Sequence, residues 1–144
     1  FYCDIDIEPL MGFDEIIDED TFFLTSASRV NNYLNPIVLA CREKNHILMR
    51  CIEEYRKKFE TKSYSYWGWS ICPILYKVMR EELGRDITNG IDSTLIASER
   101  KYKFMTEVDS PHRHELKTVF EGKVFCNNHY SNYVSMEFDG GGFQ

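Results

Sequence analysis

Two aspartates near the start of the chain have the spacing of a cation-binding pair. Asp4 and Asp6 close a short apolar run, and Pro9 follows as a turn signal. Side chains two residues apart project from the same face of an extended segment, so both carboxylates would aim at one point beyond a strand end. Mg²⁺ and Mn²⁺ take oxygen ligands and often share carboxylates with the phosphates of a substrate. The pair therefore indicates a divalent-metal site, with an ordinary polar turn as the alternative.

The residues around this pair extend the pattern. The segment reads approximately Y-x-D-x-D-x-x-P-L, matched at Tyr2, Asp4, Asp6, Pro9 and Leu10. It resembles the sugar-nucleotide glycosyltransferases with a D-x-D sugar-binding region, which include yeast-type α-mannosyltransferases and relatives in bacteria and large DNA viruses. The resemblance implies an α/β fold, a GT-A-like mixed sheet with flanking helices, of which this chain is the C-terminal half. A missing N-terminal half or a partner chain would supply the nucleotide-binding part.

Three later segments continue the resemblance. Asn35 opens an expected strand, Pro73 stands where the family has T-G-P at a helix start, and His129 is followed by aromatic and small residues. The chain departs from the family at Ile71 and Cys72, which replace T-G. This change removes a hydroxyl and adds bulk beside the expected sugar, so donor specificity and retained activity stay open.

The resemblance also implies a role for each matched residue. Asp6 would bind Mn²⁺ or Mg²⁺ directly, Asp4 would also reach the ribose or a coordinated water, and His129 would be the third metal ligand. The donor-binding residues would be Asp4, Asn35, Trp69 and Pro73. The acceptor-binding residues would be Tyr66 and Trp67. The chelated cation would neutralise the charge that builds on the departing pyrophosphate.

The implied activity is transfer of a hexose from a nucleotide-diphosphate sugar to a glycan or glycoprotein acceptor, with retention of anomeric configuration favoured. No residue is identified as a catalytic base. Two alternatives stay open. One is a non-catalytic structural or binding protein on a decayed glycosyltransferase fold. The other is a metal-dependent phosphohydrolase that uses Asp4 and Asp6, although the nearby carboxylates of residues 8–18 are typical of a solvated acidic loop.

Composition limits the other possibilities. The 144 residues suit one domain, 1–144, with a sizeable core, and aromatic residues make up 15%. The net charge of −6 argues against nucleic acid as a partner, because phosphate neutralisation needs clustered Lys and Arg. Five scattered cysteines without a C-x-x-C pair favour reduced thiols in a reducing, cytoplasmic compartment, with a lumenal protein carrying disulfides as the alternative. The resemblance to relatives in large DNA viruses also allows a virus-encoded protein.

The pattern of apolar residues predicts alternating strands and helices. Asn45 and Ser70 are expected to cap two amphipathic helices, over 46–59 and up to residue 83, and Gly84 is expected to end the second. The expected strands are residues 1–7, 21–25, 36–41, 94–97 and 102–105, with a hairpin over 119–130 broken at Gly122.

Overall fold

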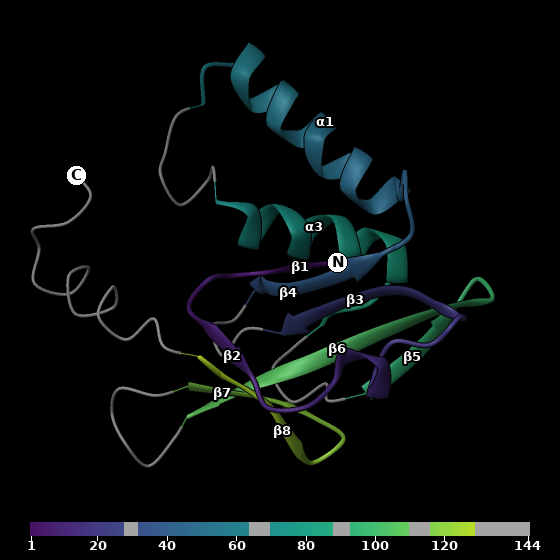
Figure 1. The fold of residues 1–144 in the computed structure, drawn as a ribbon. Helices are drawn as coiled ribbons and strands as arrows, with labels where there is room; N and C mark the ends of the chain where they lie inside the picture. The colour runs from purple at the N-terminus through teal and green to yellow at the C-terminus, as the bar shows by residue number, and fades with distance from the viewer. Residues whose placement is uncertain (28–31, 64–69, 88–92, 110–115, 129–144) are drawn as a thin grey trace, which may run out of the picture.

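A computed structural model describes residues 1–27, 32–63, 70–87, 93–109 and 116–128, and every structural statement below concerns these residues (Figure 1). In chain order their elements are β1 (Tyr2–Cys3), β2 (Ile7–Pro9), the 3₁₀ helix η1 (Phe13–Glu15), β3 (Thr21–Ala27), β4 (Leu34–Cys41), α1 (His46–Glu60), α3 (Ile71–Leu83), β5 (Ser93–Ala97), β6 (Arg100–Asp109), β7 (Leu116–Phe120) and β8 (Lys123–Asn128).

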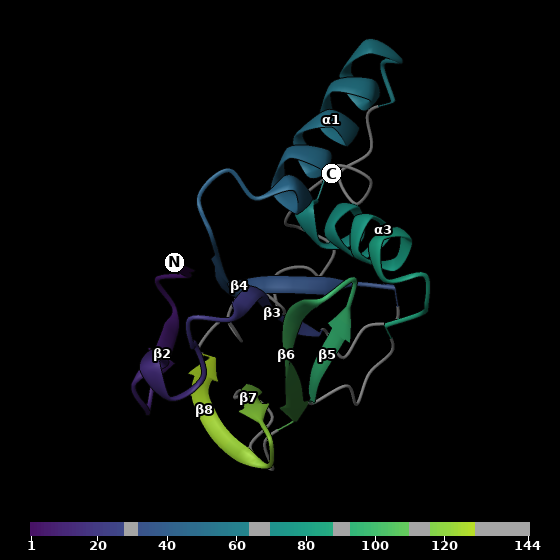
Figure 2. The ribbon, with the colours of Figure 1, turned by 90° about the vertical axis from the view of Figure 1, so that its right-hand side faces the viewer.

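The strands form one eight-stranded sheet in the order β1-β4-β3-β6-β7-β8-β2, with β5 paired to β6 beside β7. Only β3 and β6 pair in parallel among the described strands, and the others are antiparallel. The two ends of this order, β1 and β2, are consecutive in the chain and are joined by residues 4–6. The sheet therefore curls until its edges meet, which makes it a nearly closed barrel (Figure 2).

The predicted GT-A-like α/β fold is wrong. A doubly wound α/β fold has an open, mostly parallel sheet with helices on both faces. Here the sheet is mostly antiparallel, it curls on itself, α3 lies against its outer face, and α1 packs on α3 (Figures 1 and 2). The two helices of the described residues lie on one side of the sheet, and the side chains of β2, β3, β4, β6, β7 and β8 bury the inner face among themselves.

Most of the individual elements were predicted correctly. Asn45 caps α1 by accepting a hydrogen bond from the amide of Ile47, and Ser70 caps α3 in the same way through the amide of Cys72. Gly84 follows α3 with a φ of 63°, the left-handed conformation that ends many helices. The expected single strand over residues 1–7 is wrong, because a turn at residues 4–6 divides it into β1 and β2.

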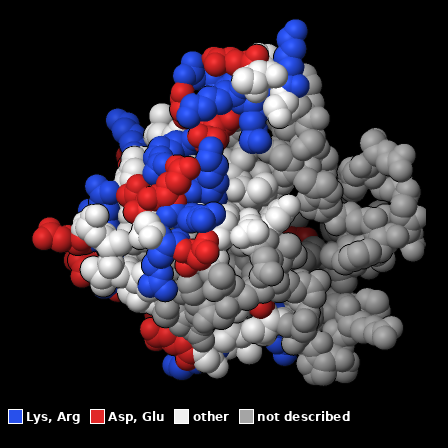
Figure 3. Space-filling view, turned by 180° about the vertical axis from the view of Figure 1, so that it is seen from behind, with Lys and Arg blue, Asp and Glu red and all other residues white. Residues whose placement is uncertain are grey.

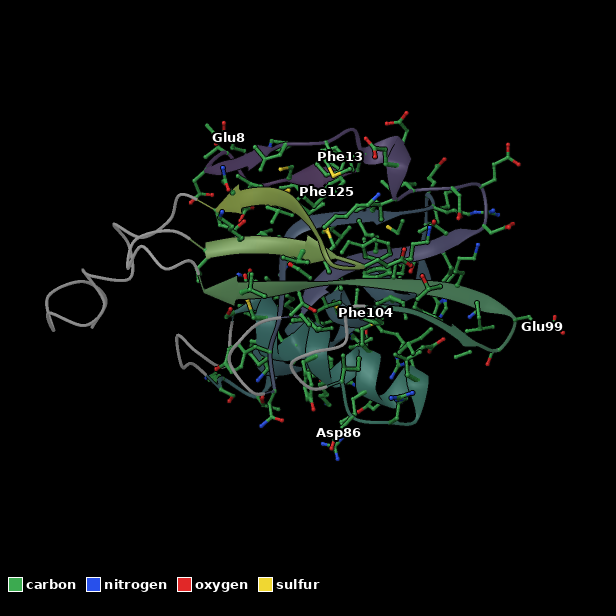
Figure 4. All side chains as sticks on the ribbon, turned by 90° about the horizontal axis from the view of Figure 1, so that it is seen from below. Glu8, Phe13, Asp86, Glu99, Phe104 and Phe125 are labelled. Carbon is green, nitrogen blue, oxygen red and sulfur yellow. The ribbon has the colours of Figure 1, made fainter. Side chains whose placement is uncertain are left out.

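The core has two parts, separated by the sheet. The outer part packs the sheet against the helices, with Phe23 and Phe104 meeting Leu75 and Met79 of α3. The inner part fills the barrel with side chains from β2, β3, β4, β6, β7 and β8. Figure 4 shows Phe104 on the helix side of β6, with Phe125 and Phe13 on the other side of the sheet. Both parts bury large apolar side chains, which supply most of the driving force for folding.

Candidate functional site

The two aspartates of the D-x-D segment lie in the turn that closes the barrel. The amide of Ile7 donates to the carbonyl oxygen of Asp4 (3.2 Å), and the amide of Asp4 donates to the carbonyl oxygen of Ile37 in β4 (2.8 Å). The Asp4 carboxylate accepts a hydrogen bond from the hydroxyl of Tyr2, and this bond raises the pKa of Tyr2. Asp4 and Asp6 are both half-buried. Both carboxylates therefore project from a tight turn, and the carboxylate of Asp4 already accepts one hydrogen bond.

Asn35 and the first turn of α3 lie near this turn. The side-chain amide of Asn35 donates to Oε1 of Glu107 at the end of β6 (2.8 Å), and the thiol of Cys72 lies 3.9 Å from the other side-chain atom, Oδ1 of Asn35. Burial raises the pKa of the Cys72 thiol, and the negative charges of Glu107 and Asp4 raise it further. The raised pKa keeps the thiol protonated and a poor nucleophile. The backbone hydrogen bond from Asp4 to Ile37 places Asp4 beside β4, two residues along the strand from Asn35.

A row of polar side chains continues from Glu107 across the inside of the barrel. Glu107 is the register partner of Thr118 in β7, and the hydroxyl of Thr118 donates to Oδ1 of Asn128 in β8 (3.0 Å). Met105, two residues before Glu107, belongs to the inner core, and so does Cys126, two residues before Asn128. Because alternate residues share a face of a strand, Glu107 and Asn128 point into the barrel above that core.

We call this region the polar end of the barrel. Its residues are Asp4, Asn35, Cys72, Glu107, Thr118 and Asn128. Glu107 is 5% exposed and Asn128 is 1% exposed. Within the part of the chain that the structure describes, the side-chain nitrogen of Asn128 has no hydrogen-bond partner. Burial of an unpaired amide is unfavourable, so this nitrogen is a feature that the fold alone does not explain.

The opposite end of the barrel is closed by the loop of residues 12–20. Lys103 on β6 is buried, and its ammonium donates to Oδ2 of Asp18 (2.9 Å) and to the carbonyl oxygen of Ile16. Asp18 also accepts from the hydroxyl of Thr21 (2.9 Å) and from Lys101 (3.2 Å). These hydrogen bonds, led by the one from Lys103, lower the pKa of Asp18 well below its usual range. We call this region the plugged end.

A further charged cluster joins the helices to the sheet. Oε1 of Glu82 lies 2.8 Å from Nε2 of His46 and accepts from Tyr102, while Oε2 accepts from Arg50. Burial raises the pKa of Glu82, but the hydrogen bond and charge of His46 and the other donors outweigh it, so the net pKa is lowered. His46 is therefore part of a network that joins α1 to α3.

The outer surface of the helices carries both signs of charge. Figure 3 shows Lys and Arg side chains interleaved with Asp and Glu side chains over this face. They form pairs such as Arg56 with Glu53 and Lys77 with Glu54. The described part of this face therefore carries charges of both signs side by side, and the prediction that nucleic acid is not a partner stays a prediction.

Four of the predicted site residues lie outside the described residues. They are Tyr66, Trp67, Trp69 and His129. The described residues contain no group of three or more His, Cys, Asp and Glu side chains arranged to hold a metal ion. They also contain no helix with the length and apolar character of a membrane span. The three other predicted donor-binding residues, Asp4, Asn35 and Pro73, come from segments that lie at the polar end.

Three residues of the polar end were not predicted from the sequence: Glu107, Thr118 and Asn128. Each is a polar residue at an inward position of a strand that otherwise alternates, such as Met105-Thr106-Glu107 and Cys126-Asn127-Asn128. A polar side chain on the apolar face was the available signal.

The five cysteines are free thiols, and burial raises the pKa of Cys51 to about 11 and of Cys126 to about 12, which makes both unreactive.

No protein-family model, curated protein or solved structure matches this chain.

Proposed function

We propose that the chain acts in metal-dependent transfer of a hexose from a nucleotide-diphosphate sugar, with the D-x-D turn holding Mn²⁺ or Mg²⁺. One observation supports this function above others. Three segments that match the glycosyltransferase pattern lie side by side: Asp4 donates its amide hydrogen to Ile37 in β4, and Cys72 in the first turn of α3 lies 3.9 Å from the side chain of Asn35 in the same strand. The proposal does not depend on a GT-A-like fold.

The chemistry of this proposal needs the two carboxylates and the cation. Asp6 and Asp4 would hold the ion, and the ion would stabilise the charge of the departing diphosphate. The third ligand proposed is His129. Asn35 suits a donor-sugar contact because Glu107 fixes the orientation of its side-chain amide through the 2.8 Å hydrogen bond. The glycan or glycoprotein acceptor would be bound by Tyr66 and Trp67.

Binding of the metal and of the diphosphate can be tested without a nucleotide pocket. Free Mn²⁺ is measured by its electron paramagnetic resonance signal, which is lost on binding, with and without inorganic pyrophosphate. Asp6→Asn keeps the shape of the side chain and should weaken Mn²⁺ binding about tenfold or more, since it removes a charged ligand. The matched control is Asp20→Asn, which neutralises an exposed carboxylate at the plugged end and should leave Mn²⁺ binding unchanged.

Equal Mn²⁺ affinity in wild type and Asp6→Asn would overturn the proposed site. The second candidate function is a non-catalytic binding protein on a decayed transferase. The hydrogen bond from Tyr2 to Asp4 favours it, because this donor competes with a cation for the carboxylate. It predicts that neither Mn²⁺ nor pyrophosphate binds, and that Tyr2→Phe does not restore binding.

A further inference from the structure

An open cleft lies beside the plugged end, where β3, β5, β6 and the residue after β4 meet. Its volume is about 500 Å³, which is within the range of small-molecule sites. Three basic side chains line it, one from the residue after β4 and two from the start of β6: Arg42, Arg100 and Lys101. Phe22 of β3 and Ile96 of β5 add apolar surface, and Ile96 is 66% exposed. The cleft therefore combines positive charge with apolar surface.

The two arginines of this cleft are held in place but keep unused hydrogen-bond donors. Nη2 of Arg42 donates to the carbonyl oxygen of Glu19 (2.6 Å), which is a neutral acceptor. The guanidinium of Arg100 lies 4.7 Å from the centre of the Phe22 ring, and its Nη1 donates to Oε1 of Glu82 (3.4 Å). Because a guanidinium has five N–H donors, both arginines have donors that no described residue accepts.

Two carboxylates also line the cleft and limit its positive charge. Asp20 lies 3.7 Å from the ammonium of Lys101, and the same ammonium donates to Asp18 (3.2 Å). These contacts balance much of the charge of Lys101. Glu99 has no ion-pair partner among the described residues, and it lies at the tip of the β5–β6 hairpin (Figure 4). The two guanidinium groups therefore supply most of the charge available to a ligand, and Glu99 repels an anion from the rim.

The number of cationic groups distinguishes between two classes of anion. Guanidinium groups bind carboxylates and phosphates, often through two parallel hydrogen bonds. A carboxylate has one charge and two oxygens, which a single guanidinium can satisfy. A phosphate monoester carries close to two charges and three acceptor oxygens at neutral pH. Two guanidinium groups beside one ammonium therefore favour the phosphate monoester, and the exposed side chain of Ile96 offers an apolar contact to its organic part.

We propose that this cleft binds a small organic phosphate monoester. Arg42 and Arg100 bind the phosphate group, and Ile96 contacts the organic part. The site uses none of the residues of the D-x-D turn and needs no metal ion, so it goes beyond the proposed function and does not depend on it.

The test measures binding of phenyl phosphate by isothermal titration calorimetry at neutral pH without divalent metal ions. Inorganic phosphate and benzoate are the comparison ligands, and both should bind more weakly. Arg42→Gln should weaken phenyl phosphate binding about tenfold, because a charged hydrogen-bonding group is lost. Ile96→Ser should weaken it about threefold and leave inorganic phosphate binding unchanged. Glu99→Gln should strengthen binding about twofold, because it removes a like charge from the rim.

The matched control is Arg85→Gln. Arg85 lines a second open cleft at the C-terminal end of α3, where the carbonyl groups of the helix disfavour an anion, so phenyl phosphate binding should be unchanged. Circular dichroism checks the fold of each variant. Equal phenyl phosphate affinity in wild type and Arg42→Gln, or an equal loss in Arg85→Gln, would overturn the site. Benzoate binding as tight as that of phenyl phosphate would overturn the choice of a phosphate.

Asp6→Asn separates this cleft from the D-x-D turn. The substitution should leave phenyl phosphate binding unchanged while it weakens Mn²⁺ binding, so the two sites can fail independently. Loss of phenyl phosphate binding in Asp6→Asn would place the phosphate at the D-x-D turn and overturn the cleft.

Discussion

The two ends of the barrel are formed by the same strands but are closed in different ways. At the plugged end, the ammonium of Lys103 has two acceptors, and Asp18 has donors on both carboxylate oxygens. Among the described residues of the polar end, Asn35, Glu107 and Thr118 have hydrogen bonds, but the side-chain nitrogen of Asn128 has none. Both carboxylate oxygens of Asp18 are therefore paired at the plugged end, while the polar end has a buried donor without an acceptor.

This difference predicts a difference in stability between the two ends. A network that holds a buried ammonium keeps one arrangement and loses stability when a member is removed. A buried row with an unpaired atom contributes little to stability, because the cost of that atom offsets the hydrogen bonds that are made. The plugged end should therefore be sensitive to mutation, and the polar end should tolerate changes that remove paired groups together. Four predictions follow this contrast from the largest effect to the smallest.

Lys103→Met should cause the largest loss. The substitution keeps the length of the side chain but removes the donor to Asp18 and to the carbonyl oxygen of Ile16. Because Asp18 is half-exposed and can be hydrated, we expect a cost of about 2 kcal/mol in the free energy of unfolding, below the range for fully buried pairs. Urea denaturation measures it. Lys101→Met is the matched control, since Lys101 is more exposed, and a control as damaging as Lys103→Met would contradict the special role of Lys103.

The cap of α1 should contribute more to the free energy of unfolding than the cap of α3. Asn45, which precedes α1, caps the amide of Ile47 and also donates to the carbonyl oxygen of Phe22 (3.2 Å), whereas Ser70, at the polar end, bonds only to the amide of Cys72 (3.3 Å) in the described contacts. Asn45→Ala should cost about 1–2 kcal/mol and Ser70→Ala about 0.5–1 kcal/mol. Thermal unfolding measures both, and a larger effect for Ser70→Ala would reverse the expected order.

Acid should weaken the plugged end. The pKa of Asp18 is lower in the folded protein than its unfolded value of about 3.9, chiefly because Lys103 donates to it. A carboxyl with a lowered folded pKa contributes stability above the unfolded pKa, and this contribution is lost as the pH falls below about 4 toward the folded pKa. The gap in urea midpoint between wild type and Asp18→Asn should therefore be larger at pH 7 than at pH 3. A gap that stays constant would show that the charge of Asp18 is not the stabilising feature.

The polar end should tolerate removal of a whole hydrogen-bonded pair. In the double variant Thr118→Val with Asn128→Leu, both partners become apolar groups of similar shape and no buried group is left unpaired. We expect a change of less than about 0.5 kcal/mol in the free energy of unfolding, measured by urea denaturation. Thr118→Val alone should cost more than the double variant, since it leaves Oδ1 of Asn128 without its donor. A double variant as unstable as Lys103→Met would remove the contrast between the two ends.

The elements could be predicted from the sequence because local signals define them. Asn45, Ser70 and Gly84 mark helix ends by short-range hydrogen bonds and backbone conformation, and Gly122 marks the turn of the β7–β8 hairpin with a φ of 78°. The closure of the sheet has no such signal. The alternation over residues 1–7 is the same for one strand as for two strands joined by a turn, so only the long-range pairing of β1 and β2 distinguishes them.

The candidate site shows the same division. The resemblance pointed to Asp4 and Asn35 because the family pattern includes them. Glu107 and Asn128 belong to no such pattern, and their proximity depends on β7 lying between their strands. Contacts of that kind follow from sheet order, which the sequence pattern of each strand does not encode.

The turn at residues 4–6 also has a consequence for the order of folding. It joins β1, whose partner β4 is nearby in the chain, to β2, which pairs Ile7 with Asn128. During synthesis on the ribosome β2 must wait until β8 has emerged, long after β3 and β4 can form their hairpin. Such distant pairings form slowly because they close the largest loops. The pairing of β2 with β8 should therefore be the last step of folding, and this pairing closes the barrel.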